Sequence, residues 1–228
     1  MRVVYGFKPS PFVRKVRVVL AEKGLPYEFE AAAPLNPYGF GPFKVSAEFM
    51  KISPLGKIPA YRDDDVTLSD SSVICAYLER AHPEPPLYPA DAYDYARALW
   101  FEEYGDTALA DVLAAKIGVP KLLGARFTNR PPDEAAIQRA VAQDLPPLFD
   151  YLEGQLTDGE AIVGPRFSIG DIGVATQFVS LRYAGFGLDA ARWPALACYI
   201  DSVLARPSFR ETMADEMATI GSSSSRHP

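Results

Sequence analysis

Short apolar runs and helical patterns alternate through the first third of the chain. Residues 2–7 read as a strand, and Ser10 with Pro11 then begins a helix, because serine is a good N-cap and proline suits the first helical position. Apolar residues follow at spacings of three and four until Gly24 ends this helix. The remaining predicted elements are a strand at 26–30, a helix at 47–52, a turn and strand within 53–61, a strand at 66–68 and a helix that is capped by residues 70–72. The order β-α-β-α-β-β-α predicts a thioredoxin-like α/β N-terminal domain over residues 1–81.

The chain reads as helical after a proline-rich stretch. Residues 82–90 hold four prolines and predict a stiff linker. Residues 91–217 carry apolar stripes at helical spacing and predict an all-α C-terminal domain. Pro146 and Pro147 interrupt one stripe, so we expect a kink or a break there. The serine-rich residues 218–228 read as a flexible tail.

Composition and charge exclude several kinds of protein. The chain has 228 residues and a net charge of −6, which opposes the cationic phosphate contacts of nonspecific nucleic-acid binding. No apolar run approaches the roughly 20 residues that a membrane span needs, and the N-terminus carries no recognisable secretory signal. We therefore expect a cytoplasmic protein that binds neither nucleic acid nor membrane.

Cysteine and histidine are too scarce for most thiol or metal chemistry. Cys75 and Cys198 lie in apolar helical patterns and are predicted to be buried, reduced thiols. His82 precedes a proline and His227 lies in the predicted tail, so neither a zinc site nor a histidine-based triad is expected. The sequence therefore predicts no metal centre.

Four stretches, taken together, resemble the cytosolic glutathione transferase superfamily over residues 1–217. They are Ser10-Pro11-Phe12-Val13-Arg14-Lys15-Val16-Arg17, Pro54-Leu55-Gly56-Lys57-Ile58-Pro59, Leu68-Ser69-Asp70-Ser71 and Ser168-Ile169-Gly170-Asp171. Each is weak alone, and their joint order and spacing carry the resemblance, which is to the serine-type, bacterial or theta-like members. It implies the glutathione transferase fold, glutathione as co-substrate, conjugation to a small hydrophobic electrophile in detoxification, and a homodimer.

The resemblance assigns the backbone of glutathione to Ile58-Pro59. Members of the family hold the bond before this proline cis, a form that costs an X-Pro bond only about 0.5–1 kcal/mol. The bend would present the N–H and C=O of Ile58 to a peptide that adds like a strand. Taken alone, these residues also allow an ordinary turn before the third strand.

Asp70 and Ser71 open a helix whose first N–H groups are unpaired and partly positive, which favours a bound carboxylate. By resemblance this is the γ-glutamyl carboxylate of glutathione, with Ser71 as donor and Asp70 near the ammonium group. A helix cap without a ligand is the other interpretation. The resemblance also places Lys57 at the glycyl carboxylate or the thiolate region, and Lys44 at the glycyl end. Either lysine could instead be a solvated surface residue.

Ser10 is the predicted catalytic residue. A thiol with a pKa of about 8.5 is mostly protonated near neutral pH, and the thiolate is the nucleophile. A hydrogen bond to a charged group is worth about 1.5–3 kcal/mol, or roughly one to two pKa units, so a serine hydroxyl could stabilise the thiolate. Ser10 could instead only cap its helix, or do both. Tyr5 is the reserve for this role, and the absence of cysteine at positions 10 and 13 argues against thiol–disulfide exchange.

The electrophile pocket is predicted between the two domains, from aromatic residues on two helices. Phe7 and Phe12 flank Ser10, while Phe101 and Tyr104 lie on the first helix after the linker. Aromatic residues at helical spacing are just as consistent with core packing.

Two roles and two functions stay open at this point. Arg14, one helical turn beyond Ser10, either orients the site or supports packing or the dimer. The alternative to a transferase is a noncatalytic glutathione-binding or protein-interaction module of the same fold. The joint presence of Ser10, Ile58-Pro59 and Asp70-Ser71 favours the enzyme.

Overall fold

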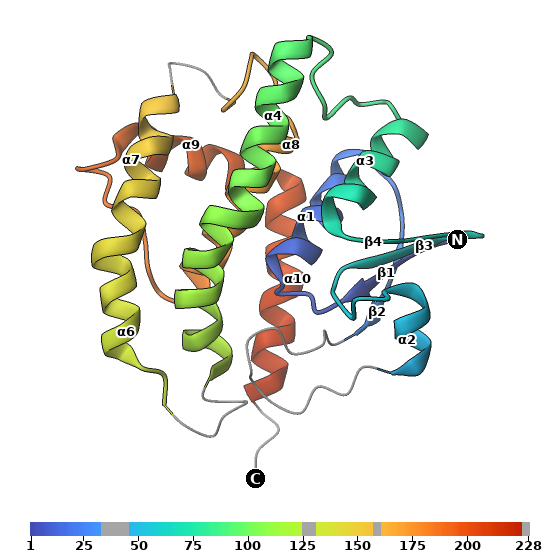
Figure 1. The fold of residues 1–228 in the computed structure, drawn as a ribbon, viewed down its shortest axis with the longest axis horizontal. Helices are drawn as coiled ribbons and strands as arrows, with labels where there is room; N and C mark the ends of the chain where they lie inside the picture. The colour runs from blue at the N-terminus through green and yellow to red at the C-terminus, as the bar shows by residue number, and fades with distance from the viewer. Residues whose placement is uncertain (33–45, 125–130, 157–160, 225–228) are drawn as a thin grey trace. The chain divides into compact units, whose positions relative to one another are not determined.

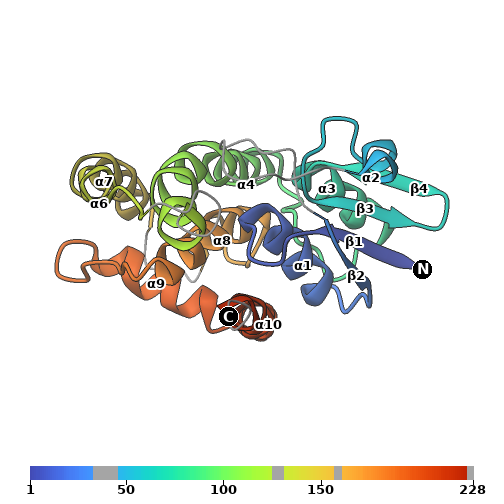
Figure 2. The ribbon, with the colours of Figure 1, turned by 90° about the horizontal axis from the view of Figure 1, so that it is seen from below.

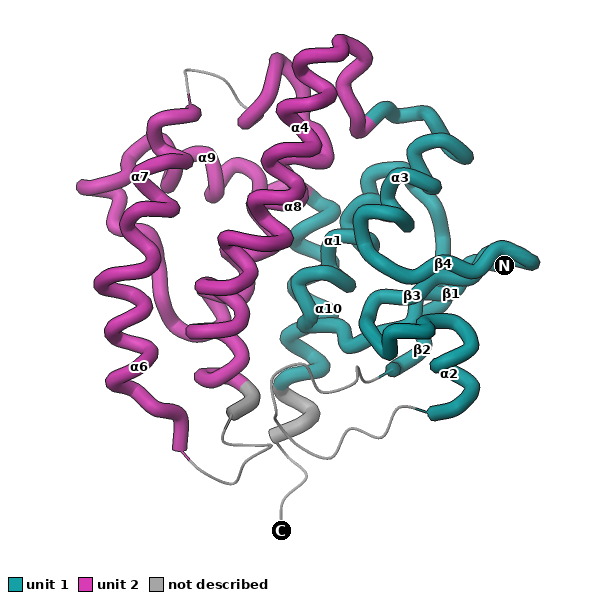
Figure 3. The backbone as a smooth tube through the Cα atoms, viewed as in Figure 1, with its two compact units in different colours: residues 1–86, 207–228 teal, residues 87–206 magenta. Residues whose placement is uncertain are grey.

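A computed structural model describes residues 1–32, 46–124, 131–156 and 161–224. The chain forms two compact units, Met1–Pro86 together with Pro207–Pro228, and Leu87–Arg206 (Figure 3). We call them unit 1 and unit 2. The chain passes from one to the other within the predicted linker 82–90.

Unit 1 is built on a mixed four-stranded sheet. Its strands are β1 (Arg2–Gly6), β2 (Glu28–Ala31), β3 (Ala60–Asp63) and β4 (Val66–Ser69), in the order β2-β1-β3-β4 (Figure 1). β1 pairs parallel with β2 and antiparallel with β3, which pairs antiparallel with β4. Together with α1 (Pro11–Glu22), α2 (Ala47–Ile52) and α3 (Ser71–Ala81), the strands confirm the predicted order of elements.

The central strand β1 is buried on both faces, so helices cover both sides of the sheet. Val3 and Tyr5 pack with Phe49 of α2 on one face. Val4 points to the other face by strand alternation and pairs with Tyr61, whose ring lies 6.1 Å from that of Tyr77 in α3. Because α1 packs on α3, these two helices form the layer opposite α2.

The last helix, α10 (Pro207–Ser224), belongs to unit 1 and packs on α1 (Figures 1 and 2). The sequence analysis had placed residues up to 217 in the helical domain and had set residues 218–228 apart as a flexible tail. The helix instead continues to Ser224. Ion pairs between residues about 200 positions apart, described below, attach it to α1, and no local pattern reveals them.

Unit 2 is helical. Its α-helices are α4 (Ala92–Tyr104), α6 (Glu134–Arg139), α7 (Leu145–Gln155), α8 (Ile169–Tyr183) and α9 (Pro194–Leu204). The π-helical segments η1 (Gly105–Gly118) and η2 (Pro120–Gly124) follow α4, and η3 (Ala140–Asp144) joins α6 to α7. No helix among the described residues is long and apolar enough to span a bilayer.

The two adjacent prolines do not break the helix in which they lie. Pro146 and Pro147 fall in the first turn of α7, where the chain changes from the π-helical η3 to α-helical hydrogen bonding. Proline is tolerated in the first turn of a helix because the N–H that it lacks is not needed there. The expected interruption is therefore a change of helix type.

The buried helix α8 is the centre of unit 2, and it passes very close to α4 and η1. A Cβ on Gly173 would lie 2.8 Å from the Cα of Glu102, and one on Gly105 would lie 2.3 Å from the carbonyl oxygen of Gly173. Glycine is required at both positions because the added Cβ would collide with backbone atoms of the neighbouring helix, which cannot move aside as a side chain can. These close approaches pack α8 tightly against α4 and η1.

The predicted box at the start of α8 is present. The fully buried carboxylate of Asp171 accepts hydrogen bonds from the N–H groups of Ile162 and Ser168 and from the hydroxyls of Ser168 and Tyr199. Burial raises the pKa of Asp171, an effect that these four donations oppose. A carboxylate with this many donors organises the start of α8 and the position of α9.

One burial prediction is wrong. Cys75 is buried in α3 as expected, but Cys198 is exposed. In α9 the buried face is formed by Leu196, Tyr199 and Ile200, and the helical period places Cys198 away from it.

Candidate functional site

Strand register brings three of the predicted motifs to one edge of the sheet in unit 1. Tyr5 pairs with Ala60, and Ala60 pairs with Ser69. The end of β1, the start of β3 and the end of β4 are therefore adjacent. Ser10 follows β1, Ile58-Pro59 precedes β3 and Asp70 follows β4, so all three leave the sheet from this edge.

Ser10 is the N-cap of α1 by its backbone but not by its side chain. Its N–H donates to the carbonyl of Phe7 at 2.9 Å, and its carbonyl accepts from the N–H of Arg14 at 2.8 Å. The hydroxyl makes no capping hydrogen bond, and it has no partner in the described part of the chain. The residue is partly exposed. Its hydroxyl is therefore available as a donor beside the positive end of α1.

The Ile58-Pro59 bond is cis, as the family resemblance implies. The preceding turn is held by the buried Ser53, whose hydroxyl donates to the carbonyl of Lys57 at 2.7 Å and accepts from its N–H at 3.1 Å. Gly56 has a φ of 62°, a conformation that favours glycine. Pro59 is buried and Ile58 is half-buried, while the side chain of Lys57 is exposed. Neither backbone polar group of Ile58 is bonded to a described residue.

Asp70, rather than a ligand, satisfies part of the start of α3. Its carboxylate accepts from the N–H groups of Ser72 at 3.0 Å and Val73 at 3.2 Å. Two of the N–H groups that the sequence analysis had left for a bound carboxylate are thus already taken. The N–H and hydroxyl of Ser71 remain without a partner among the described residues. Asp70 has a φ of 85°, a rare conformation for a residue with a side chain.

A buried lysine connects the helix of Ser10 with the helix of Ser71. The side chain of Lys15 in α1 is fully buried, and its ammonium group donates to the hydroxyl of Ser72 at 2.8 Å. The starts of α1 and α3 are therefore held together by a charged donor. The resemblance assigned no role to this lysine, although a lysine among the apolar positions of a helix is a signal of buried pairing.

The α10 acid pair, Asp215 and Glu216, also reaches this edge, and no motif pointed to it. Lys8, two residues before Ser10, donates to Asp215 at 2.7 Å. Arg14 bonds both carboxylate oxygens of Glu216 and also donates to the carbonyl of Pro9 at 3.1 Å. Arg14 and Glu216 are both fully buried.

The other predicted residues of unit 1 fall into three groups. Tyr5 is only 3% exposed, and burial raises its pKa; its reserve role stays a prediction. Phe7 and Phe12 are half-buried next to Ser10 in sequence. Lys44 lies outside the described residues.

Phe101 and Tyr104 belong to unit 2 and pack there with Tyr151. Phe101 is fully buried, and the rings of Tyr104 and Tyr151 lie 5.0 Å apart. Burial raises the pKa of Tyr104 to about 12, and its hydroxyl donates to the carbonyl of Leu148. Within unit 2 both side chains pack against other residues, and their place in the electrophile pocket stays a prediction.

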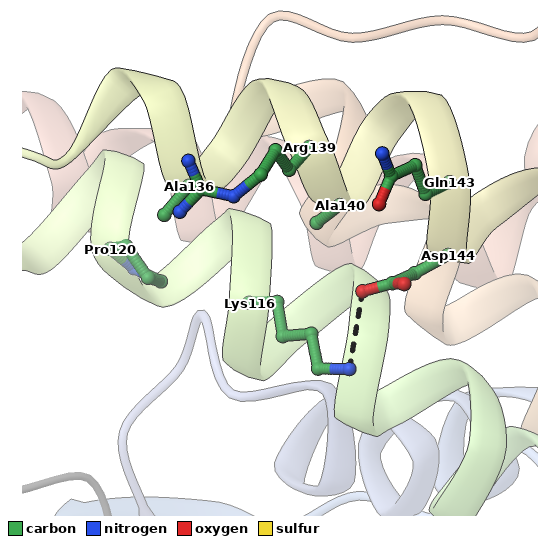
Figure 4. A pocket seen from close by; sticks show the side chains of 7 residues that line it. All are labelled: Lys116, Pro120, Ala136, Arg139, Ala140, Gln143 and Asp144. Atoms are coloured by element: carbon green, nitrogen blue, oxygen red, sulfur yellow. Dashed lines mark hydrogen bonds and ion pairs between the residues drawn. The ribbon is translucent and has the colours of Figure 1, made fainter.

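Unit 2 also contains a cavity of about 400 Å³ that includes neither of these aromatic residues. Lys116 and Pro120 line one side, and Arg139 and Asp144 line the other (Figure 4). Lys116 donates to Asp144 at 3.2 Å across it. In the described residues, no cluster of three or more His, Cys, Asp or Glu side chains could hold a metal ion.

Comparison with known proteins identifies the family. The model of the glutathione S-transferase N-terminal domain matches residues 4–86, and that of the C-terminal domain matches residues 134–202. Glutathione S-transferase 3 of Zea mays is 30% identical over 217 residues, which cover 92% of this chain and 92% of the relative. The chain belongs to the glutathione S-transferase family. As a member, it is an enzyme whose co-substrate is glutathione.

This glutathione transferase is also similar to a relative with a different name and to a solved bacterial structure. Maleylacetoacetate isomerase of Rattus norvegicus is 27% identical over 211 residues, covering 91% of this chain and 90% of the relative. A solved glutathione S-transferase of Methylobacterium radiotolerans, in complex with glutathione sulfonate, is 29% identical with a TM-score of 0.71. That similarity covers 93% of this chain and 94% of that one.

Proposed function

We propose that the Ser10 hydroxyl donates a hydrogen bond to the thiolate of glutathione, which then attacks a small hydrophobic electrophile. The observation that supports this role is that Ser10 is the N-cap residue of α1, but its hydroxyl makes no capping hydrogen bond. A donor that is not used by the protein, beside a helix N-terminus, favours a bound anion. Phe7 and Phe12, half-buried on either side in sequence, offer apolar surface for the electrophile.

The rest of glutathione is proposed to follow the same edge of the sheet. Its backbone would pair with the unbonded N–H and C=O of Ile58, as an added strand does. Its γ-glutamyl carboxylate would accept from the N–H and hydroxyl of Ser71, and its ammonium group would face Asp70. Lys57 is the proposed partner of the glycyl carboxylate or of the thiolate region, and Lys44 is the proposed partner at the glycyl end. A homodimer is the oligomeric state that the family resemblance predicts.

The test is a calorimetric titration of glutathione combined with ultraviolet detection of its thiolate across a pH series. The native protein should bind glutathione and ionise its thiol near neutral pH. Ser10→Ala should still bind, but with the pKa of the bound thiol raised by about one to two units, since the lost bond is worth about 1.5–3 kcal/mol. Ser10→Thr, which keeps a hydroxyl, should retain most of the ionisation. An unchanged pKa in Ser10→Ala would exclude the proposed role.

An isomerase is the second candidate, and the similarity to a maleylacetoacetate isomerase supports it. A thiolate that adds to a conjugated double bond and is later expelled would use Ser10 in the same way. The two reactions differ in their stoichiometry. Conjugation consumes one glutathione per turnover, whereas isomerisation returns it, so measuring free thiol during turnover separates them. Glutathione binding without turnover of any electrophile would instead favour the noncatalytic module.

A further inference from the structure

The short segment Lys8-Pro9-Ser10 is held from two sides by the C-terminal helix. Lys8 forms an ion pair with Asp215 at 2.7 Å. Arg14 donates to the carbonyl of Pro9 while its guanidinium faces the carboxylate of Glu216. The residue immediately before Ser10 and the one before that are thus both connected to the α10 acid pair.

The pair formed by Arg14 and Glu216 has the geometry of a positioning contact. Three of its donor–acceptor distances lie between 2.7 and 3.0 Å, and neither side chain is exposed. A planar guanidinium bound to both carboxylate oxygens fixes direction as well as distance. Well-packed apolar residues often replace a buried ion pair without loss of stability. Packing α10 on α1 therefore does not by itself require these charges.

We propose that Asp215 and Glu216 are positioning residues that hold the Lys8-Pro9-Ser10 segment, and with it the Ser10 hydroxyl, in register with the bound thiol. This inference rests on the proposed function, because it assumes that Ser10 bonds the thiolate. Glu216 acts through Arg14 and the carbonyl of Pro9, and Asp215 acts through Lys8. Neither touches the substrate.

A small displacement of the Ser10 hydroxyl would be enough to weaken its hydrogen bond to the thiolate. A hydrogen bond weakens steeply as its angle and distance depart from the optimum, and catalytic groups need placement to within about 0.5 Å. Releasing the carbonyl of Pro9 would let the first turn of α1 move without unfolding the helix. The thiolate would then lose part of its stabilisation, while glutathione would keep its contacts elsewhere.

The test replaces both members of the buried pair, with the double variant Arg14→Met/Glu216→Leu, so that neither is left buried without the other. Arg17, which lies 3.8 Å from Glu216, keeps its ion pair with Asp215 in this variant. The matched control is Lys23→Met/Glu79→Leu, which removes the 2.7 Å ion pair at the opposite end of α1, where Lys23 also donates to the carbonyls of His82 and Pro85. Hydrogen exchange of the Ser10 and Arg14 amides is measured without ligand. The pKa of the bound glutathione thiol is measured on the same samples.

The double variant should show faster exchange at Ser10 and Arg14, similar glutathione affinity, and a thiolate fraction near neutral pH reduced by up to about tenfold, one pKa unit. The control should match the native protein in both measurements. Asp215→Asn, at a more exposed position, should shift both measurements less but in the same direction, and it serves if the double variant does not fold. The inference would be overturned if the double variant and Asp215→Asn kept the amide exchange rates and the bound-thiol pKa of the native protein. If the native protein fails to ionise glutathione, the proposed function fails, and exchange alone then decides whether the acid pair holds the segment.

Discussion

The starts of α1 and α3 differ in a way that stability measurements can detect. Ser10 begins α1 with no side-chain hydrogen bond to the backbone, whereas the carboxylate of Asp70 accepts from the N–H groups of Ser72 and Val73 at 3.0 and 3.2 Å. Both residues are of types that cap helices well. We expect Ser10→Ala to leave the melting temperature almost unchanged, and Asp70→Ala to lower it.

The expected sizes follow from these contacts. Loss of a bonded N-cap costs about 0.5–2 kcal/mol, typically ~1 kcal/mol. In a chain of this length, a loss of 1 kcal/mol lowers Tm by about 2–4 °C. Ser10→Ala removes no bond and should stay within about 0.5 kcal/mol, a shift of less than about 2 °C. Asp70→Gly should be milder than Asp70→Ala, because glycine adopts a φ of 85° without strain.

The assay is scanning calorimetry of the ligand-free protein and the three variants at one pH and protein concentration. A decrease in Tm for Ser10→Ala as large as that for Asp70→Ala would show that the hydroxyl of Ser10 stabilises the helix. The argument that this hydroxyl is available to a thiolate would then be refuted, whatever the kinetics of the variant.

Two other predictions address unit 2 and the C-terminal helix. Gly173→Ala should lower Tm by several degrees, because its Cβ would meet backbone 2.8 Å away and overpacking costs about 1–3 kcal/mol. Gly154→Ala is the control and should not lower Tm in calorimetry, because the added Cβ would meet no atom within 4 Å beyond its own stretch of helix. Burial alone would raise the pKa of Asp215, but hydrogen bonds and charges from Lys8 and Arg17 outweigh it and leave the pKa lowered. The stability contributed by a lowered carboxyl pKa is present above the unfolded value of about 4 and is lost as pH falls through the folded value. The Tm difference between native protein and Asp215→Asn should therefore be full at neutral pH and close below about pH 4, and a constant difference would contradict the ion pairs.

The features predicted correctly from the sequence depend on neighbouring residues. Ser10-Pro11 begins a helix and Ser168 with Asp171 forms a capping box, because these signals act within one turn. The cis bond before Pro59 came from the family resemblance. The edge position of Ser10, Pro59 and Asp70 then follows from strand order.

The features that were missed depend on residues far apart in the chain. Arg14 reads as a charged helical residue, and only the fold reveals that its partner is Glu216, 202 positions later. The cap that Asp70 forms on the N–H groups of Ser72 and Val73 is local, by contrast, and it is the helix-cap interpretation that the sequence had left open beside a role at a ligand. Side-chain direction and long-range pairing are set by packing, which a local pattern does not contain.

The discontinuity of unit 1 has a consequence for biosynthesis. Domains at the N-terminal end of a chain usually fold first as the chain leaves the ribosome. Here β1 and α1 emerge early, but Arg14 and Arg17 acquire Asp215 and Glu216 only after all of unit 2 has been made. Two buried guanidinium groups cannot lose their hydration before these partners arrive without a large cost. The first unit to be synthesised is therefore the last to be completed, and a ribosome-bound chain that ends before residue 207 should hold α1 in a loosely packed state.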